Sequence, residues 1–194
     1  MSNLIPNYLV RYCIEDNNPF ISLNELPFDQ ANRIKKRHCE KYSIGGFYKE
    51  PEYLVQRKEI EDWMFSQFIR KGGRPKDKTP VYMFLGNGPI GEYDIRTDIQ
   101  KGAMGYKIFI HQLSIDTVSF CYPDSMYEME YDENGIPYDG HRTNTPEVLL
   151  YSDLEEYIKK NNVDKNPKFC IEAQVWDKER LNSIWEKKEY ILVT

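Results

Sequence analysis

The chain lacks most of the features that would assign it to a specialised class of proteins. Its four cysteines are far apart and none belongs to a C-x-x-C pair, which argues against a zinc site or a disulfide framework and favours reduced thiols. No apolar run approaches the length needed to cross a bilayer. The first residues, MSNLIPNYLVRYC, have no cationic start before their short apolar patch, so we expect no signal peptide. These absences predict a cytoplasmic protein with no membrane partner.

Positive charge is also scarce. The formal net charge of −5 argues against a general nucleic-acid coat, which needs a basic field. Two local basic clusters do occur, at residues 33–38 (RIKKRH) and 70–78 (RKGGRPKDK), and they could bind phosphate or single-stranded RNA. Charge runs more often solvate a helix. We therefore expect solvated surface, unless the two clusters lie side by side.

Aromatic residues are abundant, with fifteen Tyr, nine Phe and three Trp among 194 residues. Such side chains dominate core burial, and tyrosine can bury its ring while its hydroxyl stays wet. A chain of this length can form a real core. It has no repeat, low-complexity tract or obvious linker, so we predict a single globular domain over 1–194. Tyrosines outside the core could line a groove or a contact surface.

The order of helices and strands predicts an α+β fold. Helical periods indicate helices over 28–41 and 51–71, and a capping box at Ser152 indicates a third, to about 160. The second helix has an apolar stripe of Leu54, Ile60, Met64 and Phe68, with Trp63 nearby. Strands are expected at 8–14, 81–85, 106–110, 117–122, 126–131, 168–176 and 190–193, with a hairpin turn at 132–135. Helices early and strands late favour a mainly antiparallel, twisted sheet of about five to seven strands with two or three helices packed on it.

Two motifs suggest a bound nucleotide or metal but fail in their context. Residues 85–91 (LGNGPIG) have the glycine spacing of dinucleotide-binding loops, yet they lie outside a βαβ series and Gly102 interrupts the helical stripe that follows. A glycine-rich connection between strands explains them. Residues 130–141 resemble half of an EF-hand loop, but His141 stands where calcium needs a bidentate Glu. We expect no metal site.

The strand at 168–176 has the most informative pattern. Glu172, Gln174 and Trp176 alternate with apolar residues and so share one face. A carboxylate and an amide beside Trp could line a ligand-binding cleft on a sheet. Ordinary alternation favours the other interpretation, the solvated face of an edge strand. Glu172 is still the first choice for a functional acid, with Gln174 and Trp176 as candidate ligand-binding residues.

Arg57 and Glu61 are a second candidate ligand-binding pair. They are four residues apart on the helix predicted over 51–71, a spacing typical of a surface ion pair worth about a few tenths of a kcal/mol. If the pair instead faces inward beside Trp63, its burial would be costly. In that case it would be a better candidate for a functional site.

Three residues follow a recognisable order along the chain: Arg11 in YLVRY, Ser22 in FISLNE and Glu172 in CIEAQ. In this layout the chain is loosely similar to ADP-ribosyltransferases. The similarity implies that Arg11 would anchor the diphosphate of NAD and that Ser22 would steady the nicotinamide ribose. Glu172 would stabilise the oxocarbenium-like transition state. Many such enzymes carry Glu or Gln two residues before the catalytic Glu, where this chain has Cys170.

These patterns leave three functional hypotheses. We rank first a module that binds a small ligand or a protein partner, with no assignable reaction and no cofactor. The tyrosine-rich acidic stretch 122–142 would then be the contact surface for a protein, because tyrosine is enriched at interfaces. The alternatives are an NAD-dependent transferase and a protein that binds phosphate or single-stranded RNA through the basic clusters.

Overall fold

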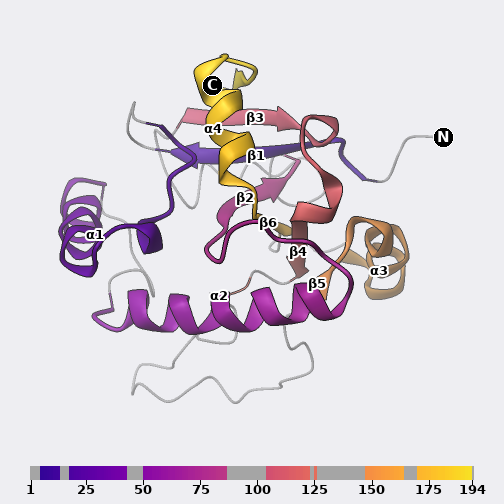
Figure 1. Ribbon diagram of the computed structural model, residues 1–194, viewed down its shortest axis with the longest axis horizontal. Coiled ribbons are helices and arrows are strands. Elements are labelled where there is room, and N and C mark those ends of the chain that lie inside the picture. Colours follow the sequence, from indigo (N-terminus) through magenta and orange to yellow (C-terminus); the bar gives the residue numbers. More distant parts are fainter. Residues whose placement is uncertain are drawn as a thin grey trace.

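A seven-stranded antiparallel sheet forms the centre of the structure (Figure 1). The computed structural model describes residues 5–13, 18–42, 50–86, 104–122, 125, 147–163 and 170–193. The strands are β1 (Tyr8–Cys13), β2 (Val81–Leu85), β3 (Met104–Phe109), β4 (Val118–Tyr122), β5 (Glu147–Leu149), β6 (Glu172–Val175) and β7 (Ile191–Val193). Their order is β5-β4-β6-β2-β1-β3-β7. Strand β6 therefore lies inside the sheet, between β4 and β2.

Four helices pack around this sheet within the described residues: α1 (Phe28–Tyr42), α2 (Tyr53–Arg70), α3 (Leu154–Asn161) and α4 (Lys178–Glu186). Short 3-10 turns are η1 (Leu23–Glu25), η4 (Ile110–Gln112), η5 (Ile115–Thr117) and η7 (Tyr151–Asp153). The predicted α+β fold with its mainly antiparallel sheet is confirmed. The expected two or three helices were too few, because α4 had not been predicted.

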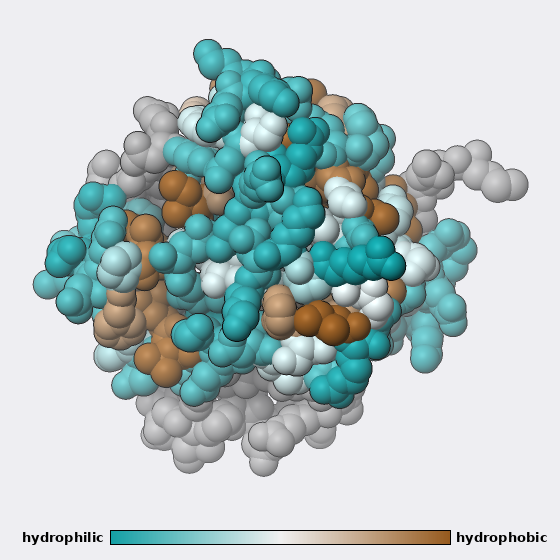
Figure 2. Space-filling view, viewed as in Figure 1, coloured by the Kyte–Doolittle hydropathy of each residue, from teal (hydrophilic) through white to brown (hydrophobic). Residues whose placement is uncertain are grey.

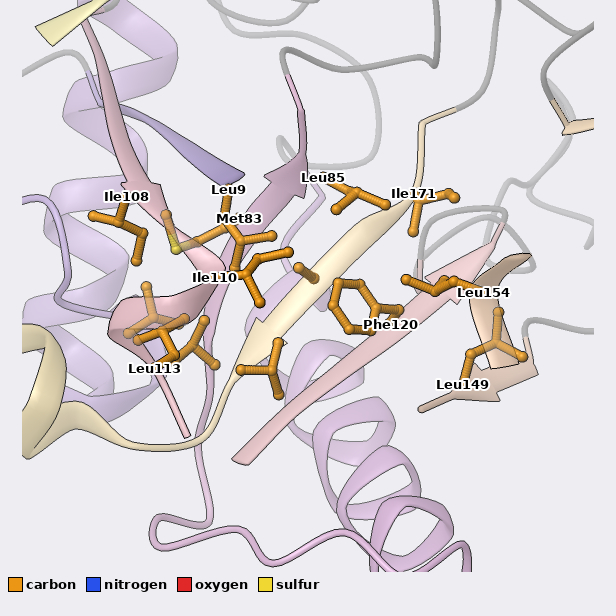
Figure 3. Packing of buried hydrophobic residues seen from close by; sticks show 14 of the residues in the cluster. Leu9, Met83, Leu85, Ile108, Ile110, Leu113, Phe120, Leu149, Leu154 and Ile171 are labelled. Atoms are coloured by element: carbon orange, nitrogen blue, oxygen red, sulfur yellow. The ribbon is translucent and has the colours of Figure 1, made fainter. Parts of the chain in front are cut away.

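The main hydrophobic core lies on the face of the sheet that α3 and α4 cover. Period-2 alternation points every second residue of β2, β4 and β6 toward this face. Figure 3 shows these side chains gathered against the strands. The fully buried members of this core include Leu9, Met83, Leu85, Ile108, Phe120, Leu149, Leu154, Ile158 and Ile171.

Helix α2 covers the opposite face. Its buried residues are Leu54, Arg57, Glu61, Met64 and Phe68, whose spacing of three and four residues is that of one helix face. Trp63, which the sequence placed beside the apolar stripe, is instead exposed. Two central positions of the inward face are thus charged.

The C-terminal end of α2 is shaped by glycine. Gly72 has a φ of 100°, a conformation that favours glycine after a helix. The N–H of Gly73 donates to the carbonyl of Phe68 at 2.9 Å. A Cβ on Gly73 would meet the Phe68 ring at 2.3 Å, so the ring needs glycine at this position. The prediction that paired glycines end this helix is confirmed, because α2 ends at Arg70, shortly before Gly72 and Gly73.

Several elements agree with the sequence patterns, and several expectations lie outside the described residues. Strand β2 has the predicted bounds. Both ends of helix α2 lie within two residues of the predicted bounds, 51 and 71. The strand expected at 126–131, the hairpin turn at 132–135, glycine-loop residues 87–91 and the EF-hand-like stretch are not described. The expectation of a single domain stays a prediction.

Phe68 anchors α2 to the sheet, so its removal should be costly. Its ring is fully buried and stacks on Trp176 with 6.2 Å between the ring centroids. We expect Phe68→Ala to lower the free energy of unfolding by about 3–5 kcal/mol, since a large core cavity remains. Urea denaturation measures this value. The adjacent Ile69 is 49% exposed, and Ile69→Ala should change it by less than about 0.5 kcal/mol. Equal losses in the two variants would contradict this packing.

Candidate functional site

A buried polar cluster lies between α2 and the sheet. Glu172, Gln174 and Trp176 point to this face of β6, and all three are buried. The expectation that they form the solvated face of an edge strand is therefore wrong. The physical reason is that β6 pairs with β2 on one side and with β4 on the other. Helix α2 then covers the face that carries Glu172 and Gln174.

Strand register lines up the polar residues of this face. Gln174 lies opposite Tyr82 of β2 and opposite Ser119 of β4. Trp176 Nε1 donates to Ser119 Oγ at 2.8 Å, and Ser119 Oγ donates to Gln174 Oε1 at 2.8 Å. Gln174 Nε2 in turn donates to Glu172 Oε1 at 2.8 Å. This chain of hydrogen bonds ends on the Glu172 carboxylate.

Arg57 approaches the same carboxylate from α2. Its Nη1 donates to Ser125 Oγ at 3.0 Å, and Ser125 Oγ donates to Glu172 Oε1 at 2.6 Å. Arg57 Nη2 lies 3.8 Å from Glu172 Oε2. The guanidinium carbon is 3.4 Å from the centroid of the Tyr82 ring, which is cation–π geometry. Arg57 therefore joins α2 to strands β2 and β6.

The predicted surface pair of Arg57 and Glu61 is buried, so that expectation is wrong. Arg57 is 8% exposed and Glu61 only 2%, with 3.9 Å between Arg57 Nε and Glu61 Oε1. The cause is the phase of the helix, because residues 57 and 61 share a face with Leu54 and Met64. Burying two charges costs several kcal/mol per ion before their attraction offsets it.

Three polar atoms around Glu61 are buried without a hydrogen-bond partner in the described part of the chain. They are Glu61 Oε1, Asn24 Nδ2 and the Tyr82 hydroxyl. Burial raises the pKa of the Glu61 carboxyl, while Asn24, Arg57, Tyr82 and Lys58 each lower it in part. Asn24 and Tyr82 lower this pKa as donors beside the carboxylate, but neither Asn24 Nδ2 nor the Tyr82 hydroxyl reaches the distance and angle of a hydrogen bond in the described part of the chain.

The guanidinium of Arg57 also has donors that make no hydrogen bond within the described residues. Arginine carries five N–H groups in a fixed fork. Among the residues that the structure describes, Arg57 makes one hydrogen bond, to Ser125, and two longer ion pairs. Neither Nε nor Nη2 is near enough to a carboxylate for a hydrogen bond. The edge of the fork formed by these two nitrogens therefore makes no hydrogen bond to a described carboxylate.

Arg11 borders the cluster, whereas Ser22 lies to one side. Arg11 Nη1 donates to the carbonyl of Tyr82 at 2.8 Å, and its Nε to that of Pro19 at 3.1 Å. Burial raises the pKa of the Tyr53 hydroxyl, and the charges on both Arg11 and Glu172 act on it. No hydrogen bond joins Ser22 to Arg11 or Glu172 within the described ranges. The N–H of Ser22 donates to the Glu25 carboxylate at 3.0 Å.

Sequence reasoning missed the residues that complete the cluster, namely Asn24, Tyr82, Ser119 and Ser125. One signal was available in the strands. Ser119 and Tyr82 alternate with apolar residues, so each shares a face with whatever covers its strand. The strand pairing that sets them beside Gln174 joins segments far apart in the chain, and local pattern does not contain it.

The basic clusters lie apart in the fold. Residues 33–38 are on α1, which lies beside the N-terminal end of α2. Residues 70–78 begin with the last residue of α2 and continue beyond its C-terminal end (Figure 1). The 18 residues of α2 span roughly 27 Å. Lys71 pairs with Glu147 and Lys76 with Asp177, each at 2.8 Å. The clusters thus do not meet the condition under which we expected a phosphate site.

Comparison with known protein families, curated proteins and solved structures finds no match for this chain. Among the described residues, no helix is both long and apolar enough to span a bilayer. In the same ranges, no three His, Cys, Asp or Glu side chains are grouped so as to hold a metal ion. The cytoplasmic location stays a prediction.

The raised pKa of Glu61 predicts how stability depends on pH. Its pKa in the folded chain lies above the ordinary 4.5. At a pH between 4.5 and the pKa of the folded chain, the folded state therefore binds more protons than the unfolded state. The free energy of unfolding therefore falls as pH rises through this window. Glu61→Gln removes the titration, so it should gain stability relative to wild type as pH increases from about 4 to about 8.

Urea denaturation of both proteins across this pH range measures the effect. Glu59→Gln is the matched control, because Glu59 is exposed on the same helix, and its difference from wild type should not show this trend. A wild type that gains stability over Glu61→Gln as pH rises would overturn the assignment.

Proposed function

We propose that this chain is a binding module for a small polar ligand, held by the buried cluster between η1, α2 and β2. The observation that carries the proposal is a set of three buried atoms with no hydrogen-bond partner among the described residues, on Asn24, Glu61 and Tyr82, one from each of these elements. A buried polar group without a hydrogen bond costs about 1–3 kcal/mol. Native proteins rarely leave such groups together, and a ligand would supply the missing partners.

A purely structural role explains less of the arrangement. The hydrogen bonds from Trp176 through Gln174 to Glu172 hold strands together, as a structural network should. Glu61 lies beside them with no hydrogen bond to Oε1 in the described residues. Charged groups with shifted pKa values cluster at functional sites, and this difference supports ligand binding at the Glu61 side of the cluster.

A small ligand is favoured over a protein partner in the described part of the chain. Figure 2 shows a largely hydrophilic face with separate hydrophobic patches. The exposed large apolar residues belong to several elements: Ile21, Phe28, Val55, Trp63, Ile69, Ile115, Ile191 and Leu192. Scattered residues of this kind are ordinary on a protein surface. The stretch 122–142 lies mostly outside the described residues, so its role as a protein-contact surface stays a prediction.

Thermal unfolding with panels of sugars, nucleosides, primary amides, carboxylates and phosphates tests the proposal. A ligand at 100 times its Kd should stabilise the chain by about 2.7 kcal/mol, roughly a 5–10 °C rise in Tm at this chain length. Asn24→Ala should lose this rise because it removes one of the donors. Gln30→Ala, at an exposed position of α1, should keep it. A rise retained in full by Asn24→Ala would place the ligand elsewhere.

An NAD-dependent transferase is the second candidate. Strands β1, β2 and β6 are neighbours, and Arg11 reaches the Tyr82 carbonyl, opposite Gln174 and two residues from Glu172. The nearness of Arg11 and Glu172 supports the hypothesis drawn from the similarity to ADP-ribosyltransferases. Arg11 would anchor the NAD diphosphate, and Glu172 would stabilise the developing ribose cation as nicotinamide leaves. Ser22 gains no comparable support, and Arg57 offers the cluster a second cation.

Release of nicotinamide from NAD by the purified chain tests this candidate. If Glu172 stabilises the transition state, Glu172→Gln should reduce kcat by at least about 100-fold. Glu179→Gln, at an exposed position of α4, should leave it unchanged. The unfolding transition of each variant shows whether it is folded. Equal turnover by Glu172→Gln and wild type, or no turnover by wild type, would sink the candidate.

A further inference from the structure

The charges around the unpartnered atoms alternate in sign. The Arg57 guanidinium has Glu61 at its Nε side and Glu172 at its Nη2 side, at 3.9 and 3.8 Å. Both distances exceed that of a hydrogen bond, so two donors and the carboxylate oxygens facing them are left apart. The ligand therefore meets an acceptor, a donor edge and a second acceptor in turn.

This alternation disfavours a ligand that carries a single charge of either sign. An anion that bound the Arg57 fork would also face Glu61 and Glu172, and like charges repel strongly where water is scarce. A cation that bound either carboxylate would face Arg57. An apolar group would leave the polar atoms of Asn24, Glu61 and Tyr82 unpaired, which binding sites strongly reject.

Hydroxyl groups suit the arrangement because each is one donor and two acceptors. A hydroxyl can accept from Arg57 Nε and donate to Glu61, while its neighbour accepts from Nη2 and donates to Glu172. Nε and Nη2 present parallel N–H bonds along one edge of the fork, which favours two adjacent hydroxyls over one. Asn24 and Tyr82 would hold a further oxygen of the same molecule.

We propose that the ligand is an uncharged compound with a vicinal diol, either a free sugar or the ribose of a nucleoside. This inference rests on the proposed function, since it assigns the chemistry of the ligand at the same cluster. A free sugar and a nucleoside both carry the diol. The experiment must therefore show whether the diol is recognised and which of the two kinds of ligand binds.

Calorimetric titration of the full chain provides this test. The probes are adenosine, 2′-deoxyadenosine, D-ribose, methyl glucoside, nicotinamide and inorganic phosphate. If the diol is recognised, 2′-deoxyadenosine should bind at least about tenfold more weakly than adenosine, because a site built for a hydroxyl rejects the analogue without it. Binding of adenosine supports a nucleoside, whereas binding of only ribose or glucoside supports a free sugar. Glu61→Gln should weaken binding about tenfold, and the Glu59→Gln control should not.

Each remaining outcome decides between the two proposals. Equal binding of adenosine and 2′-deoxyadenosine, or binding of phosphate or nicotinamide alone, overturns the diol. In these cases the proposed function stands if Glu61→Gln still weakens binding and Glu59→Gln does not. Binding unaffected by Glu61→Gln, in a variant with a cooperative unfolding transition, places the ligand elsewhere. If no probe binds to the wild type at millimolar concentration, the diol is overturned, and the wider thermal-unfolding panel decides the proposed function.

Discussion

The buried positive charge of Arg57 determines how one face of the molecule is built. A guanidinium in the interior costs several kcal/mol unless partners surround it. Here they are the Tyr82 ring, the Ser125 hydroxyl, and the carboxylates of Glu61 and Glu172. These groups come from β2, from the residue at 125, from α2 itself and from β6. The charge can be accommodated only where these segments meet, so it sets the position of α2 on the sheet.

The two ends of this face have different physical roles. At one end Met64 and Phe68 pack on Trp176, and burial of such side chains is worth roughly 1.5–3 kcal/mol each. At the other end Arg57 and Glu61 face polar strand residues, where desolvation largely offsets their attraction. The apolar end therefore supplies most of the stability that holds α2. The polar end is retained at a cost, and such a cost is typical of sites selected for function.

Local pattern predicted the elements but not which of their faces would be covered. The periods of α2 and β6 were predicted, with Leu54, Met64 and Phe68 on the apolar stripe of α2. Arg57 and Glu61 were expected at the surface, although they share that buried face. Whether either face of β6 meets water depends on its pairing with β2 and β4 and on what covers the sheet, and the hydrogen bond from Arg57 to Ser125 joins residues 68 positions apart. Contacts of that separation leave no local pattern.

Helix α4 was a different kind of omission. Asp177 caps it by accepting a hydrogen bond from the Arg180 N–H, and Asp is a common residue at a helix start, so a local signal was present.

Two glutamates of the cluster differ in how far the fold satisfies their oxygens. Glu172 Oε1 accepts hydrogen bonds from both Ser125 and Gln174, so the fold itself satisfies this oxygen. Glu61 is 2% exposed against 7% for Glu172, and its Oε1 accepts none from the described residues. A sequence shaped only for folding would complete both carboxylates or replace Glu61 with an apolar residue. Because Glu61 is buried beside other charged groups and its Oε1 accepts no hydrogen bond from the described residues, it is the part of the cluster that folding alone explains least.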